Sequence, residues 1–90
     1  MRLDVFLWQA RLARTRGRAQ ALIAARGVRI DGRRVEKPAA SVGPGNTLTF
    51  AEGDRVRVVR IAALPVRRGP AEEARRCYVD LAIDDARTQT

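Results

Sequence analysis

The segment 15–35 constrains the fold most, because it combines the start and end signals of a helix with those of a tight hairpin. Thr15 is a favourable N-cap residue, apolar residues follow it at helical spacing, and Gly27 is a typical C-terminal stop. Two short apolar stretches then flank Asp31 and Gly32, a dipeptide that favours a two-residue type I′ turn. The sequence therefore predicts a capped helix that leads directly into a β-hairpin.

The predicted turn also fixes the pairing of the hairpin. With two residues in the turn, Arg29 stands opposite Arg34, while Val28, Ile30 and Val35 share the other face. Two guanidinium groups placed directly opposite each other repel. Because a phosphate between them would remove this conflict, the hairpin is a candidate phosphate site.

The N-terminal stretch predicts a further helix. Apolar residues recur at helical spacing from Leu3 onward, which indicates an amphipathic helix over residues 3–12. Trp8 extends the apolar stripe of this helix. A tryptophan in such a stripe packs in the core more often than it stacks on a nucleobase, so we expect Trp8 in the core.

The middle of the sequence favours strands. The stretch 47–50 predicts one strand and, after a turn, the alternating stretch 55–64 predicts a second one. The alternation slips between Val58 and Val59, which predicts a β-bulge or a change in the covered face. Arg55 and Arg57, which precede the slip, are expected to face solvent.

A short third helix is predicted after Pro65, where "GPAEEARR" places glutamates in the first turn and arginines later. We expect this helix to reach about Tyr78, with the apolar residues that follow docked against it and a frayed tail at the end. The chain is accordingly divided into a folded domain, residues 1–64, and a basic C-terminal extension, residues 65–90.

Length and composition exclude several classes of protein. Ninety residues fit one domain with a modest core. The sequence has no histidine and a single cysteine, Cys77, so it lacks the usual general base and the ligands of a metal site. The N-terminal stretch lacks the apolar run that is typical of a signal peptide and the length that a membrane span needs. We therefore expect a cytoplasmic protein that is not an enzyme, needs no cofactor or metal, and has no membrane partner.

The positive charge is concentrated in the first third of the chain. Residues 1–35 hold nine arginines and two aspartates, whereas residues 36–90 hold nine basic and eight acidic residues. A preference for arginine over lysine does not explain this shortage of acids. The asymmetry indicates a surface for a polyanion, and nucleic acid is the most common polyanion for such a surface.

The predicted second helix suits phosphate groups. Its N-terminus combines free N–H groups with the positive end of the helix dipole, and Arg16 and Arg18 lie in its first turn. Arg26 and Arg29 flank its exit, so arginines from two elements can clamp a phosphate backbone. A helix that reads DNA bases needs polar side chains, whereas this one is rich in Ala, Leu and Ile, which favours structured RNA.

These elements also resemble a known family. The stretch from "RLDVFLWQAR" to "RIDGRRV" has an "RLD" opening, a Thr–Arg pair before the second helix, a glycine at its exit and an Asp–Gly turn. It resembles the S4 RNA-binding domain over about the first 50 residues. Within that family, "LWQAR" and "RRGPAEEARRCY" resemble the ribosome-associated heat shock protein fifteen family.

The resemblance implies an α+β fold of the S4-like (alpha-L) type, with two N-terminal helices packed on a small, mostly antiparallel sheet and a short C-terminal helix. It also implies binding to ribosomal RNA of the large subunit. Such proteins are associated with large subunits that are blocked by peptidyl-tRNA after heat stress. The implied partners are ribosomal RNA and the large subunit, with tRNA as a further candidate, and we expect a monomer.

The candidate RNA contacts come from two sources. Position by position, the resemblance assigns RNA binding to Arg2, Thr15, Arg16, Gln20, Gly27, Val28, Asp31 and Gly32. The charge pattern adds Arg18, Arg26, Arg29, Arg33 and Arg34. Asp31 departs from the asparagine that is usual in the family, and its carboxylate repels phosphate.

Two alternatives remain open at this point. The chain could be an RNA-guiding accessory that acts in trans with an RNA-modifying enzyme, because S4-type domains are similar to the modules of such enzymes. It could also be a DNA-binding regulator of the helix-turn-helix type. Competition between structured RNA and duplex DNA distinguishes the second alternative from an RNA-binding protein.

Overall fold

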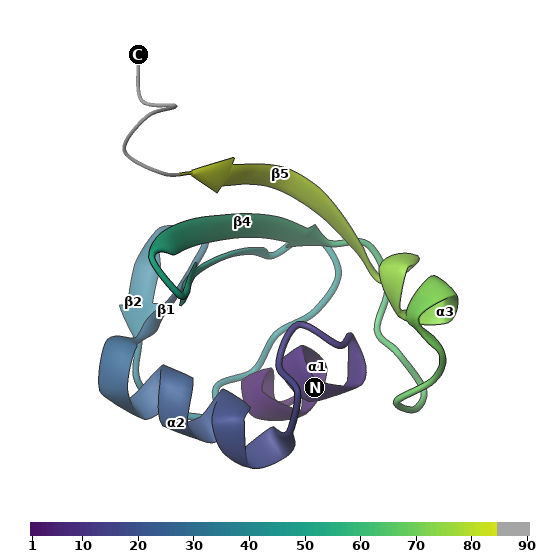
Figure 1. Ribbon diagram of the computed structural model, residues 1–90, viewed down its shortest axis with the longest axis horizontal. Coiled ribbons are helices and arrows are strands. Elements are labelled where there is room, and N and C mark those ends of the chain that lie inside the picture. Colours follow the sequence, from purple (N-terminus) through teal and green to yellow (C-terminus); the bar gives the residue numbers. More distant parts are fainter. Residues whose placement is uncertain (85–90) are drawn as a thin grey trace.

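The computed structural model describes residues 1–84, which form three helices and a five-stranded sheet (Figure 1). The sequence predicts a frayed tail over residues 84–90; Asp84 instead ends the last strand, and residues 85–90 lie outside the described residues. The elements are α1 (Leu3–Gln9), α2 (Arg16–Arg26), β1 (Val28–Ile30), β2 (Arg33–Val35), β3 (Thr47–Glu52), β4 (Arg55–Ile61), α3 (Ala71–Arg75) and β5 (Tyr78–Asp84). The predicted α+β class is confirmed.

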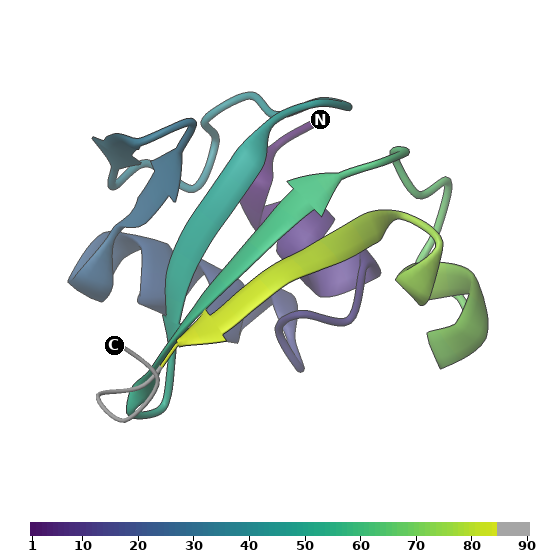
Figure 2. The same ribbon diagram turned by 90° about the horizontal axis from the view of Figure 1, so that it is seen from above.

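The sheet has the strand order β2-β1-β3-β4-β5, and all neighbouring strands are antiparallel. Helices α1 and α2 cover one face of the sheet (Figure 1). The view from above shows β3, β4 and β5 side by side over these helices, with no helix on the opposite face (Figure 2). Helix α3 lies at the end of the sheet where β5 begins (Figure 1).

The core lies between the two N-terminal helices and the sheet. Helix α1 contributes Leu3, Phe6 and Leu7, and α2 contributes Ala19 and Ile23, which are all fully buried. The strands contribute Val28, Leu48, Phe50, Val59 and Ile61, and Val42 joins the core from the segment before β3. Because each large apolar side chain stabilises the fold by about 1.5–3 kcal/mol when fully buried, this core fixes how α2 sits on the sheet.

Helix α1 is shorter than the sequence predicts. It ends at Gln9, because the chain turns at Arg11, whose φ of 60° is left-handed and cannot continue a helix. The prediction that Trp8 lies in the core is wrong. Trp8 is half-buried and is not among the residues that pack against the core.

The predicted hairpin is confirmed. Asp31 and Gly32 have φ angles of 52° and 85°, which are the two positive values that a type I′ turn requires. Arg29 pairs with Arg34, as the two-residue turn demands. Ile30 and Val35 are partly buried against the core.

The register of β4 and β5 shifts between Val58 and Val59, as the sequence predicts. The extra residue is Leu81, so the bulge lies in β5. The prediction that Arg57 faces solvent is wrong: its side chain is only 16% exposed and lies on the helix-covered side of the sheet, where Asp80 lies beside it.

The C-terminal part differs most from the prediction. Helix α3 ends at Arg75 instead of reaching Tyr78, and residues 78–84 form strand β5 instead of docking the helix. Strand β5 pairs with β4 along most of its length, so part of the predicted extension completes the sheet of the domain. The sequence alternates after Tyr78, and this alternation is the signal for a strand that the prediction missed.

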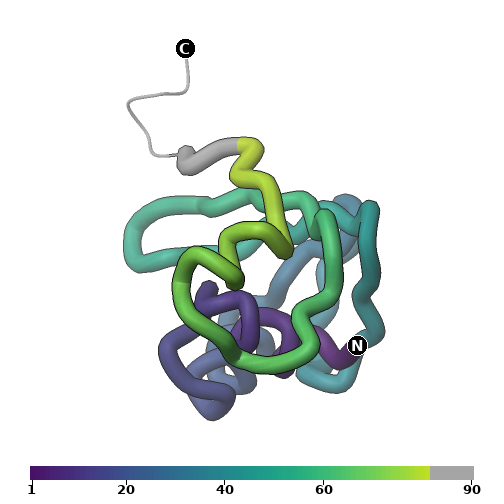
Figure 3. The backbone as a smooth tube through the Cα atoms, turned by 90° about the vertical axis from the view of Figure 1, so that its right-hand side faces the viewer, coloured from purple at the N-terminus to yellow at the C-terminus, as the bar shows by residue number. Residues whose placement is uncertain are grey.

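The chain between β4 and α3 is tied to the loop between α1 and α2, which it passes closely (Figure 3). Arg68 donates hydrogen bonds to the carbonyl oxygens of Trp8 and Arg14, at 3.1 and 3.3 Å. In return, Arg11 donates from Nε to the carbonyl oxygen of Gly69, at 2.6 Å. These bonds hold the loop from which α2 starts.

Candidate nucleic-acid interface

Helix α2 begins and ends as the sequence predicts. The hydroxyl oxygen of Thr15 accepts a hydrogen bond from the backbone N–H of Arg18, at 3.0 Å. At the other end, Gly27 has a φ of 76° and a ψ of 158°, a conformation that essentially only glycine adopts. The two caps fix the ends of the helix, and the residues of its first turn, Arg16, Gly17 and Arg18, are exposed.

A buried carboxylate, Asp4, organises the N-terminal end of α2. The side chain of Asp4 is fully buried and accepts hydrogen bonds from Arg2, Arg16 and Gln20. The distances are 3.0 and 3.1 Å from Arg2, 3.3 Å from Arg16 and 2.9 Å from Gln20. Three residues predicted to contact RNA are therefore joined at one internal acceptor.

The interaction lowers the pKa of Asp4. Burial alone would raise the pKa, but hydrogen bonds from Arg2, Gln20 and Arg16 outweigh it and lower the pKa to about 2. The carboxylate is therefore charged at neutral pH. The side chains of Arg2 and Arg16 remain 47% and 46% exposed, so their other N–H groups can still reach a phosphate.

Sequence reasoning missed Asp4 as a member of this site. Asp4 stands in the apolar stripe of α1, within the "RLD" opening. A charged residue at a buried position of a helix indicates that another side chain pairs with it. The spacing between Asp4 and Gln20 gives no hint of their contact, because two separate helices bring them together.

A second group of arginines surrounds the C-terminal end of α2. Arg26, Arg29 and Arg34 line one hollow of about 230 Å³ together with Gly27 and residues of β3 and β4. Arg26, Arg29 and Arg34 are exposed. The structure thus brings together arginines from α2, β1 and β2, as the sequence predicts, beside the strand face that α1 and α2 leave open.

The repulsion between Arg29 and Arg34 is partly relieved within the protein. Arg29 donates to the carbonyl oxygen of Gly32 at 3.0 Å, and Arg34 lies 3.6 Å from the carboxylate of Glu36. The ion pair with Glu36 is weak, because both side chains are more than half exposed. A phosphate between the two arginines stays a prediction.

Asp31 has a structural role in the hairpin. Its carboxylate accepts a hydrogen bond from the backbone N–H of Thr47 at 2.8 Å and another from the side-chain amide of Asn46 at 2.7 Å. These bonds anchor the turn to β3. The carboxylate that departs from the family pattern therefore accepts hydrogen bonds from two uncharged donors of the protein itself.

The remaining predicted contacts differ in their exposure. Val28 is 1% exposed and packs in the core, so its side chain does not reach the surface. Gly32 and Arg33 are exposed at the hairpin. Among the described residues, no carboxylate lies within 4.0 Å of the guanidinium groups of four predicted contacts, which are Arg18, Arg26, Arg29 and Arg33.

Gly27 is expected to tolerate no side chain. A Cβ atom there would lie 2.6 Å from Nε of Arg34, and the positive φ adds strain. We expect Gly27→Ala to lower the free energy of unfolding by about 1–3 kcal/mol. Chemical denaturation checks this value against Gly43→Ala, which lacks a positive φ and meets no atom within 4 Å. Equal stability of the two variants would contradict the backbone strain that a side chain at Gly27 is expected to cause.

Two further findings concern residues 1–84. No group of three or more Cys, Asp or Glu side chains within this range is arranged to hold a metal ion. Each helix in the same range is too short or too polar to span a bilayer.

The comparisons with known proteins agree with this geometry. Residues 1–48 match the family model of the S4 domain. Heat shock protein 15 of Escherichia coli (strain K12) is 38% identical over 82 residues, which are 91% of this chain and 61% of that protein. The chain therefore spans about three fifths of the length of these curated relatives.

A ribosomal protein and a solved structure are also similar to this chain. Small ribosomal subunit protein uS4 of Staphylococcus haemolyticus is 43% identical over 51 residues, which are 57% of this chain and 26% of that protein. A solved structure described as trimeric heat shock protein 15 of Vibrio cholerae superposes with a TM-score of 0.83. It is 33% identical, with 91% of this chain and 82% of that chain covered. The chain belongs to the S4 domain family and is a heat shock protein 15-like member of it.

Proposed function

We propose that this chain is a non-enzymatic RNA-binding protein of the ribosome that recognises structured ribosomal RNA by its phosphates and its shape. The RNA-binding surface consists of α2 and the β1–β2 hairpin, and we call it the helix–hairpin surface. The S4 domain and the similarity to ribosomal protein uS4 and heat shock protein 15 support an RNA ligand.

One observation supports this proposal most strongly. Four exposed arginines on or beside the helix–hairpin surface have no carboxylate within 4.0 Å among the described residues; they are Arg18, Arg26, Arg29 and Arg33. Guanidinium groups without carboxylate partners bind phosphate oxygens with paired hydrogen bonds. Arg26 and Arg29 line the same hollow, whereas Arg33 pairs with Ile30 and projects from the opposite face of the hairpin. A polyanion would therefore supply the counter-charges that the protein lacks.

RNA fits this surface better than duplex DNA. The side chains of α2 that are exposed between its arginines are alanines, Ala21, Ala24 and Ala25, which donate no hydrogen bond to a base. The surface therefore offers charge and shape but few groups that read base edges. Double-stranded RNA is recognised mostly by shape and by contacts to its phosphates and 2′-hydroxyl groups.

We further propose that the bound RNA belongs to the large ribosomal subunit and that the protein acts on subunits blocked by peptidyl-tRNA after heat stress. The name of its relatives in Escherichia coli and Vibrio cholerae, heat shock protein 15, supports a role in stress. A monomer remains the expectation for this chain, although the Vibrio cholerae relative is described as trimeric. Sedimentation equilibrium of the purified chain decides between the two states.

Sedimentation of a cell lysate through a sucrose gradient tests the proposal. We expect the chain in the fractions that contain the large subunit, and we expect more of it there after heat stress. Its presence only in small-subunit fractions would contradict the choice of subunit. Its recovery with a modifying enzyme and without ribosomal subunits would instead support an accessory role in RNA modification.

A further inference from the structure

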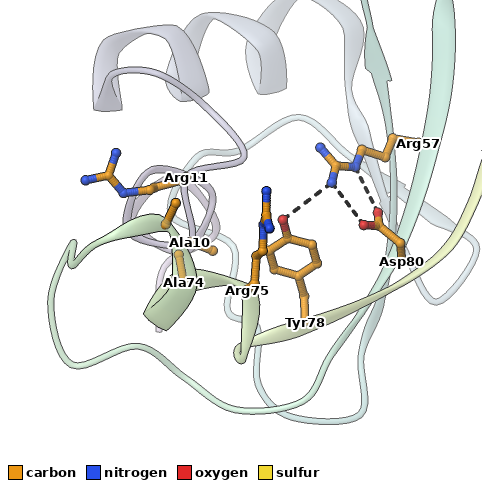
Figure 4. Close-up of a pocket in the computed structure, with 8 residues that line it drawn as sticks. Ala10, Arg11, Arg57, Ala74, Arg75, Tyr78 and Asp80 are labelled. Carbon is orange, nitrogen blue, oxygen red and sulfur yellow. Dashed lines mark hydrogen bonds and ion pairs between the residues drawn. The ribbon is translucent and has the colours of Figure 1, made fainter.

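A second polar site lies away from the hairpin, at the end of the sheet where α3 is found (Figures 1 and 4). It is a pocket of about 570 Å³ between the C-terminal end of α1, helix α3 and strands β4 and β5. This volume lies within the range of roughly 300–1,000 Å³ that is typical of small-molecule sites. None of the residues assigned to the helix–hairpin surface lines it.

One wall of the pocket is a fixed hydrogen-bond network around Arg57 (Figure 4). Arg57 donates to both carboxylate oxygens of Asp80, at 3.0 and 3.2 Å, and to Oη of Tyr78, at 3.4 Å. It also donates to Glu52 at 3.0 Å. Each oxygen of Asp80 keeps a lone pair, and the hydroxyl of Tyr78 keeps its proton. The wall therefore presents two adjacent acceptors and one donor.

Two arginines lie at the edge of the pocket. Arg75 is exposed on α3, has no carboxylate within 4.0 Å among the described residues, and extends beside Tyr78 (Figure 4). Arg11 is held by its bond to Gly69, and its guanidinium group points outward (Figure 4). The left-handed φ of Arg11 is costly for a residue with a side chain, and such conformations cluster at ligand sites.

The rest of the lining is small. Ala10, Ala71 and Ala74 contribute only methyl groups, which leave the space in front of Tyr78 open. The pocket thus has a hydrogen-bonding wall, apolar alanine surfaces and a positive edge. A nucleotide has the same division between a flat base with polar edges and a charged phosphate.

We infer that this pocket binds an unpaired guanine nucleotide of RNA, with the base against Asp80 and Tyr78 and the phosphate near Arg75. The Watson–Crick edge of guanine offers two adjacent N–H donors to a carboxylate and one oxygen to a hydroxyl donor. The choice of RNA as the source of the nucleotide rests on the proposed function. The geometry of the pocket is independent of that proposal.

A simple anion site accounts less well for the same residues. The deepest guanidinium group, that of Arg57, is already bonded to the carboxylates of Glu52 and Asp80. These two negative charges repel a phosphate that enters the pocket. A neutral base avoids this repulsion, and the phosphate stays at the edge beside Arg75, which has no carboxylate partner within residues 1–84.

Titration of the full chain with mononucleotides, followed by NMR, tests the inference. We expect 5′-GMP to shift the amide signals of Arg75, Tyr78 and Asp80 in a saturable manner. The affinity for 5′-UMP should be about tenfold lower, because uracil offers one N–H donor in place of two adjacent ones. The inference is wrong if inorganic phosphate shifts the same signals equally well, if both nucleotides bind alike, or if neither binds.

Matched variants separate the pocket from general attraction to positive charge. Arg75→Ala should weaken the binding of 5′-GMP about tenfold, because a charge-assisted hydrogen bond is lost. Arg76→Ala removes the same charge from an exposed neighbour that does not line the pocket and should leave the affinity unchanged. Ala71→Leu fills the pocket without a change in charge and should abolish binding. Equal effects of Arg75→Ala and Arg76→Ala would overturn the inference.

The test is independent of the ribosome. Arg29→Ala should leave the binding of 5′-GMP intact while it weakens the binding of large subunits, since Arg29 does not line this pocket. A chain that binds 5′-GMP but no ribosomal subunit would contradict the proposed function alone. A chain that binds subunits but no nucleotide would contradict the pocket alone.

Discussion

Replacing Arg26 and Arg29 together by alanine is expected to weaken the binding of large ribosomal subunits roughly 100-fold or more. Each arginine loses a charge-assisted contact to phosphate, and two such contacts account for a loss of this size. The fold should change little. Both side chains are exposed, and within the described part of the chain they bond to the carbonyl oxygens of Gly53 and Gly32, at 3.5 and 3.0 Å. Filter binding at constant salt measures the affinity.

A double variant of equal charge is the control for this result. Arg60→Ala combined with Arg76→Ala removes two exposed arginines that lie outside the helix–hairpin surface. We expect its affinity to fall much less. If both double variants lost affinity equally, the attraction would come from the net charge of the chain, and the helix–hairpin surface would not be a defined site.

Asp4→Ala is expected to have the largest effect on stability. The substitution removes the acceptor of three side chains at once, those of Arg2, Arg16 and Gln20. Because Arg2 and Arg16 are half exposed, water can solvate them, and we expect a loss of about 2–4 kcal/mol in the free energy of unfolding. Affinity for RNA should fall as well, since Arg16 and Gln20 lose their fixed positions.

The pH dependence of stability isolates the charge of Asp4. Its pKa is about 2 in the folded protein, against 3.8 for an aspartate side chain in water, so the charged form stabilises the fold by about 2 kcal/mol. This contribution is fully present above about pH 5 and disappears as the pH falls toward 2. The difference in unfolding free energy between the wild type and Asp4→Asn should therefore shrink over the same range. A constant difference would contradict the role of the charge.

Arg16 illustrates why the structure changes the choice of test residues. From the sequence, Arg16 and Arg29 are equivalent phosphate contacts. In the structure, Arg16 also bonds to Asp4, so Arg16→Ala would disturb the fold and the surface together. Arg18→Ala is the cleaner substitution at this end of α2, because no carboxylate lies within 4.0 Å of Arg18 among the described residues.

The sequence predicts the elements whose signals are local. Thr15 and Gly27 mark the ends of α2, and the Asp31–Gly32 dipeptide determines both the turn type and the register of the hairpin. These features depend on residues within a few positions of one another. They were therefore predictable from capping and turn preferences alone.

The features that the sequence did not predict depend on distant residues. From the sequence, Arg57 has the position of a solvent-facing residue in a strand. In the folded protein it forms an ion pair with Asp80, which is 23 positions away in the sequence. Asp4 likewise binds Arg16 and Gln20 from another helix. Ion pairs of this kind arise from the packing of whole elements, which no local pattern encodes.

The salt dependence of RNA binding tests the central claim most directly. If the helix–hairpin surface neutralises about five phosphates, a plot of the logarithm of affinity against the logarithm of salt has a slope near −3.5 to −4.5. For Arg29→Ala, the magnitude of this slope should decrease by about 0.7–0.9, which is the contribution of one phosphate contact. Arg76→Ala should retain the slope of the wild type. An Arg29→Ala slope equal to that of the wild type would show that the RNA phosphates are bound elsewhere.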